Sequence, residues 1–216
     1  MSASPDENAA LEKRLRAALA DSHERAPRPL AKLDLPIAVQ RKLMPVALRE
    51  LKPAAVLAPV LQRADGPHML LTRRADHLKS HKGQVSFPGG RRDAADQSAA
   101  ANALREAREE VGLAPHHVDV LGYLDDYPTG TGYRVTPVVG LVRGQPQLTA
   151  DPGEVAEVFE VPMSLILNPA SYRRAFFVSE GLRLPYFELN YAEQRIWGAT
   201  AWMLRDLCLK LQAHED

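Results

Sequence analysis

The chain contains segments in which apolar residues recur every three to four positions, separated by shorter apolar runs. The first pattern is typical of amphipathic helices and covers residues 5–22 and 198–212. A short helix is expected over residues 37–49, after a connector marked by prolines at 26–29, and another over residues 162–167. We expect these helices to cover a sheet.

The shorter apolar runs are bounded by glycine, proline and aspartate, and they predict strands. Residues 54–62 and 68–73 are joined by the turn Asp65-Gly66-Pro67, which favours a hairpin. Further strands are expected over residues 85–87, 118–125, 134–143, 155–161, 172–178 and 183–188, the last two as a second hairpin. Helices that flank a mixed sheet predict an α/β fold, an α/β/α sandwich with an N-terminal helical extension.

One more helix is expected before Gly112, and it carries an acidic face. Glu106, Glu109 and Glu110 are three and four residues apart, so we expect them on one side. The opposite side carries an apolar stripe made of Ala100, Leu104, Ala107 and Val111. An acidic helix face alone is usually solvated surface. Here it follows a strand and the glycine loop Phe87-Pro88-Gly89-Gly90, and a hard divalent cation would relieve the repulsion among the carboxylates. The segment therefore predicts a magnesium site.

The composition indicates one globular domain. The chain has 216 residues, 45% hydrophobic and 25% charged, enough for one well-buried core. Its 27 basic and 27 acidic side chains cancel, so neither nucleic acid nor a membrane is expected as a partner. The single cysteine, Cys208, is interpreted as a core residue. No signal sequence and no apolar stretch of roughly 20 residues is found, so the expected location is the cytoplasm. We place a helical extension at residues 1–50 and the main domain at 51–212.

The order of strand, glycine loop and acidic helix resembles the Nudix box, the loop-helix motif of the Nudix hydrolases. Arg105 to Leu113 fits the second half of this motif, Arg-Glu-apolar-x-Glu-Glu-x-Gly-apolar, at every position. The first half departs from it, because the loop between Gly90 and Arg105 has one residue more and Asp96 stands where the motif has Glu. We expect Asp96 to reach Arg105, or to cap the helix together with Ser98.

Residues upstream resemble a second motif, which marks the coenzyme A diphosphatase branch of this family. It comprises Leu70-Leu71-Thr72-Arg73-Arg74-Ala75, then Lys79, Gly83 and the glycine loop. Lys79 stands where that motif generally has Arg, which keeps the charge but loses the planar guanidinium. The resemblance implies the Nudix fold and hydrolysis, dependent on Mg²⁺ or Mn²⁺, of the diphosphate bond of coenzyme A or its thioesters. The products would be 3′,5′-ADP and 4′-phosphopantetheine or its acylated form.

The resemblance also implies roles for the residues of the box. Glu106 and Glu110 are expected to bind the metal ion, and Glu109 is expected to be a third ligand or the residue that orients the attacking water. A backbone carbonyl of Gly89 or Gly90 would complete the shell. Arg105 is counted with the catalytic residues as a scaffold that pairs with acids of the loop.

The base that activates water is expected outside the box, at Glu154 or Glu157. We favour Glu157, because a strand would place it on the same face as Val155 and Phe159, and an acid that faces inward needs a reason to be there. Glu154 lies at the mouth of the strand beside Gly153, where loops carry function.

Basic residues near the glycine loop are the candidates for binding the substrate. They are Arg73, Arg74, Lys79, Arg91 and Arg92. Coenzyme A has a 3′-phosphate besides its diphosphate, which favours local positive charge. The alternatives are a Nudix hydrolase of ADP-ribose or NADH, and a domain that only senses a nucleotide, although such domains ordinarily lose part of the acid set. The partner is a small molecule, and the sequence also allows a homodimer.

Overall fold

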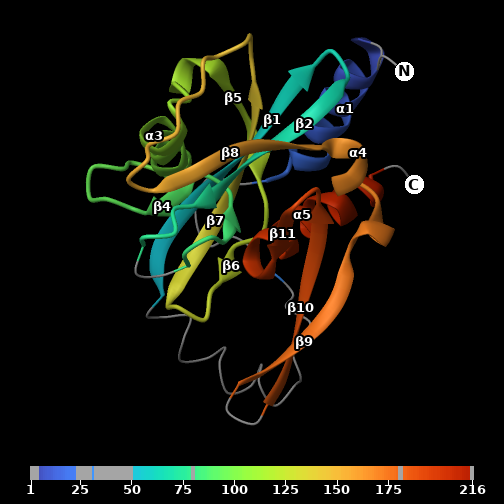
Figure 1. Ribbon diagram of the computed structural model, residues 1–216. Helices are drawn as coiled ribbons and strands as arrows, with labels where there is room; N and C mark the ends of the chain where they lie inside the picture. The colour runs from blue at the N-terminus through green and yellow to red at the C-terminus, as the bar shows by residue number, and fades with distance from the viewer. Residues whose placement is uncertain (1–4, 23–30, 32–50, 79–80, 180–181, 215–216) are drawn as a thin grey trace.

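The computed structural model describes residues 5–22, 31, 51–78, 81–179 and 182–214 (Figure 1). The connector predicted at residues 26–29, the helix predicted at 37–49 and Lys79 lie outside the described residues. The boundary predicted at residue 50 lies outside them as well, and it stays a prediction.

A mixed sheet of eight strands forms the centre of the fold. Five strands lie side by side in the order β3-β2-β1-β7-β5, while β4 pairs with β1, β6 with β7 and β8 with β2. Their bounds are β1 Lys52–Arg63, β2 Gly66–Arg74, β3 Val85–Ser86, β4 Gly89–Arg91, β5 Val118–Tyr123, β6 Tyr127–Pro128, β7 Tyr133–Val142 and β8 Val155–Pro162. β1 and β7 run parallel, and every other pair in this sheet is antiparallel. The predicted strands are confirmed, whereas β4 and β6 are too short to carry an alternating pattern.

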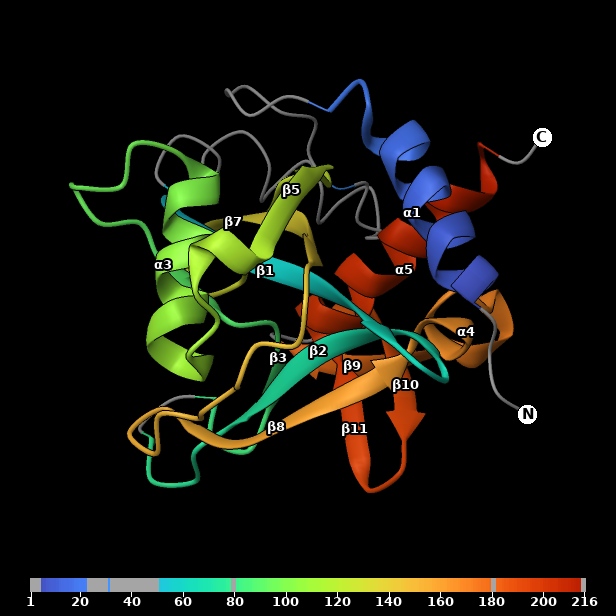
Figure 2. The ribbon, with the colours of Figure 1, turned by 90° about the horizontal axis from the view of Figure 1, so that it is seen from above.

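Helices cover both faces of this sheet, as Figure 2 shows. Helix α3 (Ala99–Val111) packs on one face, and α1 (Pro5–Leu19), α4 (Met163–Ile166) and α5 (Gly198–Gln212) pack on the other. β1 is apolar toward both layers, since Ala55 and Leu57 contact the α3 side and Ala54 and Ala58 the opposite side. Two short 3₁₀ turns, η1 (Pro115–His117) and η2 (Pro169–Ser171), complete the connections. The predicted α/β/α sandwich is confirmed.

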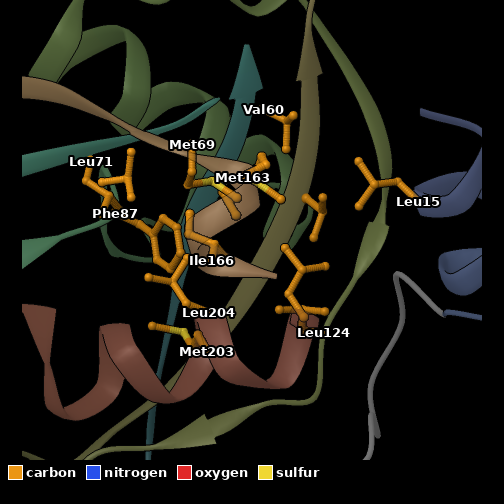
Figure 3. Close-up of a cluster of buried hydrophobic side chains, with 14 of the residues drawn as sticks. Leu15, Val60, Met69, Leu71, Phe87, Leu124, Met163, Ile166, Met203 and Leu204 are labelled. Carbon is orange, nitrogen blue, oxygen red and sulfur yellow. The ribbon is translucent and has the colours of Figure 1, made fainter. Parts of the chain in front are cut away.

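The larger core cluster lies between the sheet and α5 (Figure 3). β2, α4 and α5 contribute Met69, Leu71, Met163, Ile166, Met203 and Leu204. Leu15 of α1 is 0% exposed and belongs to the same cluster, so α1 is part of this core. Cys208 is buried, which confirms its interpretation as a core residue.

A second, three-stranded sheet extends from the C-terminal part of the fold (Figure 1). It consists of β9 (Arg173–Ser179), β10 (Leu182–Tyr191) and β11 (Gln194–Trp197), all antiparallel and in the order β11-β10-β9. The predicted hairpin of residues 172–178 and 183–188 is confirmed. β11 was not expected, because its four residues follow β10 after a turn of only two residues.

An ionic cluster around the buried Glu188 links the three strands of this second sheet. Glu188 of β10 is only 1% exposed, and it accepts hydrogen bonds from Arg195 of β11 (Nε 3.0 Å, Nη2 2.6 Å) and from Arg173 of β9. The hydrogen bond from Arg195, and then that from Arg173, hold the pKa of Glu188 below its ordinary value. A buried carboxylate with two cationic partners is therefore expected to contribute to stability in its ionised form.

Replacing Glu188 by Gln should lower the free energy of unfolding at neutral pH by about 1.5–3 kcal/mol, the range for hydrogen bonds to charged groups. We expect the lower end, because the side chains of Arg173 and Arg195 are 73% and 53% exposed. The contribution is present above the unfolded pKa of about 4.3 and is lost as the pH falls through the lower folded-state pKa. Urea unfolding should therefore show a smaller gap between wild type and variant near about pH 3. A gap of the same size at both pH values would mean that Glu188 acts through packing.

Candidate active site

Helix α3 is fixed at both of its ends by local hydrogen bonds. Ser98 has extended backbone geometry, and its hydroxyl accepts a hydrogen bond from the backbone N–H of Ala101 at 3.1 Å. At the other end Gly112 adopts a left-handed conformation with φ 71°, and its N–H donates to the last turn. These caps fix the two ends of α3, and with them the position of its glutamates relative to the glycine loop.

Asp96 binds Arg105 rather than capping the helix. Two guanidinium nitrogens of Arg105, Nε and Nη2, donate to the two carboxylate oxygens of Asp96 at 3.1 and 3.0 Å. Asp96 is buried, and the hydrogen bond from Arg105 is the main cause that lowers its pKa. Arg105 also donates to Glu106 at 2.9 Å and to Glu109 at 2.8 Å. The shorter acid in the longer loop thus reaches the arginine, and this geometry fits the scaffold role predicted for Arg105.

Glu106 and Glu110 both lie against the glycine loop, which β4 places beside α3. The carboxylate Oε2 of Glu110 accepts a hydrogen bond from the backbone N–H of Gly89 at 3.2 Å. A Cβ atom added to Gly90 would lie 2.7 Å from the carboxylate atoms of Glu106. The lack of a side chain at Gly90 therefore allows the loop backbone to approach the carboxylate of Glu106 closely.

The three glutamates on the expected acidic side of α3 differ in their exposure to solvent. The side chain of Glu109 is 57% exposed, whereas Glu110 is buried with 3% exposed. The reason is the orientation of the helix, since its packed side runs through Ala103 and Ala107, both 0% exposed, and Glu110 lies seven residues after Ala103. Glu110 is therefore an acid on the packed side of the helix.

Glu110 is buried and Glu106 half-buried, so desolvation acts on both carboxylates. Burial raises the pKa of Glu110 to about 8 and is also the main cause of the raised pKa of Glu106. The nearest cation to Glu110 is Arg74, whose Nη1 lies 3.8 Å from Oε1. Among the described residues no three acidic, histidine or cysteine side chains form a metal site by themselves. The pair Glu106 and Glu110, with a backbone carbonyl of the glycine loop, has the hard oxygen donors and the unbalanced charge that fit Mg²⁺ or Mn²⁺.

Glu154 and Arg74 lie next to this pair. The side chain of Glu154 is half exposed, and its Oε2 lies 4.0 Å from Nη2 of Arg74. Its charge acts on both Glu106 and Glu110, where it raises their pKa values. The loop that carries Glu154 is tied to the end of α3, because the backbone N–H of Asp151 donates to the carbonyl of Glu110 at 2.9 Å. Residues far apart in the sequence thus meet around one carboxylate pair.

The expectation that Glu157 faces inward from its strand is wrong. The pairing of β2 with β8 contains a bulge, since Arg73 lies opposite Glu157 and Arg74 lies opposite Val155. The extra residue breaks the alternation, so Val155 is buried and the side chain of Glu157 is 45% exposed. Glu157 accepts hydrogen bonds from Arg73 at 3.3 Å and from Gln194 at 2.9 Å. These contacts tie β11 to β2, and the catalytic role of Glu157 stays a prediction.

The predicted substrate-binding residues differ in their surroundings. Arg92 donates to the backbone carbonyls of Asp96 and Gln97 at 2.8–3.1 Å, so it stabilises the loop before α3. Arg73 lies with Glu157 and Asp76, on the opposite side of β2 from Arg74. Arg91 is exposed beside the glycine loop. Their roles in binding remain predictions.

Asn102 was not identified from the sequence. It is 0% exposed on α3, and its Nδ2 donates to the carbonyl of Arg91 at 3.3 Å, which fastens β4 to the helix. A polar residue within an alanine-rich helical segment is the signal that could have indicated it.

The two glycines of the loop should respond differently to alanine. Gly90→Ala should lower activity by about 100-fold, because the added Cβ would displace the carboxylate of Glu106. A displacement of a functional group by about 1 Å can lower the rate by about this factor. Stability should change little, because a carboxylate is the mobile end of its side chain. Gly89→Ala should instead lower the melting temperature, because its Cβ would lie 2.5 Å from backbone atoms of Ala55 and Val56. Activity and thermal unfolding of both variants test this, and an active, stable Gly90→Ala would contradict the geometry.

The NUDIX domain family matches residues 51–177. The chain belongs to the Nudix family. Proteins of Yersinia pestis (strain Pestoides F) and Yersinia pseudotuberculosis serotype O:1b (strain IP 31758), each named "Uncharacterized Nudix hydrolase NudL", are 45% identical over 154 residues, 71% of this chain and 77% of theirs. The crystal structure of the MutT protein from Methanosarcina mazei Go1 is 18% identical, with a TM-score of 0.48 over 76% of this chain and 95% of that one.

As a Nudix hydrolase, the protein cleaves phosphoric anhydride bonds, and the predicted enzyme class is confirmed. Nudix enzymes bind small nucleotide substrates and typically use a divalent metal ion. Among the described residues there is no helix of the length and apolar character needed to cross a membrane.

Proposed function

We propose that this Nudix hydrolase cleaves the diphosphate of coenzyme A or its thioesters to 3′,5′-ADP and 4′-phosphopantetheine or its acylated form. One observation carries this proposal. The upstream motif typical of coenzyme A diphosphatases and the acidic helix meet in space, where Arg74 lies 3.8 Å from Glu110. The proposal includes a small-molecule substrate as the partner and the cytoplasm as the location.

In this proposal Glu106 and Glu110 hold Mg²⁺ or Mn²⁺. The bound ion would neutralise charge on the diphosphate oxygens and lower the pKa of a coordinated water. The raised pKa of the buried Glu110 and the close approach of the glycine loop support these two residues as ligands. Glu109, which is more exposed and bonded to Arg105, is the candidate for orienting the water.

Arg74 is the residue that we assign to the diphosphate itself. Its guanidinium lies between the buried Glu110 and the exposed Glu154 and is 26% exposed, so it can turn from these acids to an incoming anion. A guanidinium can donate two parallel hydrogen bonds to phosphate oxygens. The exposed Arg91, which follows Gly90 directly, is the candidate for the 3′-phosphate.

Glu154 is the base that we now favour over Glu157. Its carboxylate lies on the same side as Arg74, and its charge acts on Glu106 and Glu110, whereas Glu157 is bonded to Arg73 and Gln194. Glu154 would take a proton from the attacking water as the water oxygen bonds to phosphorus. The anhydride P–O bond then breaks, and the bridging oxygen leaves with the second phosphate.

A comparison of substrates tests this proposal. With Mg²⁺ present, kcat/KM should be higher for coenzyme A or an acyl thioester than for ADP-ribose, NADH or 8-oxo-dGTP. Dephospho-coenzyme A separates recognition of the 3′-phosphate from recognition of the rest of the molecule. A preference for ADP-ribose or NADH would contradict the substrate but not the enzyme class. Tight binding of a nucleotide without hydrolysis of any diphosphate would favour a sensor.

A further inference from the structure

Two loops meet beside the carboxylate pair, and a histidine joins them. One loop follows β2 and the other, at residues 151–154, precedes β8 (Figure 2). Nε2 of His77 lies 3.1 Å from the backbone carbonyl oxygen of Gly153. A carbonyl oxygen can only accept, so Nε2 must carry the proton and donate it. His77 thereby holds the peptide that directly precedes Glu154.

The neighbouring hydrogen bonds show that this contact is part of a clamp. The backbone N–H of Ala75 donates to the carbonyl of Glu154 at 2.9 Å, so the loop after β2 holds two successive carbonyls of the second loop. On the other side, the N–H of Asp151 donates to the carbonyl of Glu110 at 2.9 Å. The loop of Glu154 is therefore fastened between the helix of the metal ligands and the loop of His77.

Of the contacts that join this loop to the loop after β2 and to α3, only that of His77 comes from a side chain; within the loop, the carboxylate of Asp151 also accepts a hydrogen bond from the N–H of Gly153 at 2.8 Å. The peptide that His77 holds belongs to Gly153, whose backbone has no Cβ to restrict it. Glu154 itself is half exposed, with its nearest cation 4.0 Å away, so packing does little to fix its carboxylate. The position of this carboxylate relative to Glu106 and Glu110 depends on where residue 153 is held.

We propose that His77 is a positioning residue for catalysis, which holds the loop of Glu154 so that this carboxylate faces the metal-binding pair. The inference rests on the proposed role of Glu154 as the base. His77 is exposed on its loop, and its hydrogen bond goes to the backbone of Gly153. Its loss should therefore alter the chemical step rather than the fold or the affinity for substrate.

The test compares steady-state kinetics on coenzyme A with Mg²⁺. His77→Ala should lower kcat about tenfold, because a small displacement of a catalytic group has a large effect, while KM changes less than about twofold. His77→Gln should recover most of kcat, because the Gln amide can place a donor close to the position of Nε2. The matched control is His117→Ala, since Nδ1 of His117 lies 3.0 Å from the carbonyl of Arg143, a contact that does not involve the loop at residues 151–154. The control should leave kcat unchanged.

A double-mutant cycle with Glu154→Gln completes the test. If His77 acts through Glu154, His77→Ala should have little further effect in the Glu154→Gln background. An equal effect in both backgrounds, or a normal kcat for His77→Ala, overturns the inference while the role of Glu154 stands. A normal kcat for Glu154→Gln overturns the proposed base, and the inference about His77 fails with it. If His77→Ala melts at a much lower temperature than wild type and its KM rises, His77 has a structural role instead.

Discussion

Glu110→Gln is expected to lower kcat by at least about 100-fold and, at the same time, to stabilise the metal-free protein. Activity falls because the substitution removes a charged metal ligand. Stability rises because Glu110 is 3% exposed and burial disfavours its carboxylate, which raises its pKa to about 8. The amide oxygen of Gln can still accept the hydrogen bond from Gly89. Each unit by which burial raises the pKa corresponds to about 1.4 kcal/mol, so replacing this acid by a neutral group should add about 1–3 kcal/mol to the free energy of unfolding at neutral pH.

Urea unfolding in EDTA and activity with Mg²⁺ measure the two effects on the same preparation. The control is Glu7→Gln, since Glu7 is exposed on α1 and should alter neither quantity. In wild type, Mg²⁺ should raise the melting temperature, because a ligand that binds only the folded state stabilises it. The variant should lose this response. A variant that melts far below wild type in EDTA would mean that Glu110 holds the fold together rather than a metal ion.

Arg74→Ala is expected to lower kcat/KM about 10- to 100-fold, since hydrogen bonds between charged groups contribute about 1.5–3 kcal/mol. The loss should be equal for coenzyme A and dephospho-coenzyme A, because Arg74 lies at the carboxylate pair, where the diphosphate must sit. A larger loss for coenzyme A would assign Arg74 to the 3′-phosphate.

Arg63→Ala is the matched control for Arg74→Ala. Arg63 has the same side-chain exposure, 26%, and also pairs with a carboxylate, Glu160, but at the other end of the β1–β2 hairpin. Its loss removes an ion pair of the sheet and should leave kcat/KM unchanged. Equal losses of activity in both variants would mean that the effect comes from damage to the sheet.

Most of the fold could be predicted because its signals are local. The hairpin of β1 and β2 follows from apolar runs around a turn, and α5 was placed at residues 198–212 by its spacing alone. What was missed depends on pairing between distant segments. β4 exists because Gly89–Arg91 pairs with β1, and the bulge opposite Arg73 and Arg74 puts Val155 out of phase with Glu157. Neither can be derived from the period of one segment.

The sequence predicted which residues form the candidate site, but not how their side chains are arranged. The motif fixes which glutamates are present, but the orientation of α3 on the sheet decides that Glu110 is buried and Glu109 exposed. The contact between Asp96 and Arg105 depends on the course of a loop, and that between His77 and Gly153 joins two loops 76 residues apart. Such contacts become visible only once the sheet brings the loops together.

The proposed role of the carboxylate pair of α3 is to support hydrolysis of the diphosphate of coenzyme A. Incubation of the purified protein with coenzyme A and Mg²⁺, followed by separation of the products, tests this role. Wild type should give equal amounts of 3′,5′-ADP and 4′-phosphopantetheine, EDTA should abolish both products, and Glu110→Gln should form them at least about 100-fold more slowly. Release of inorganic phosphate with dephospho-coenzyme A, or product formation that persists in EDTA, would contradict it.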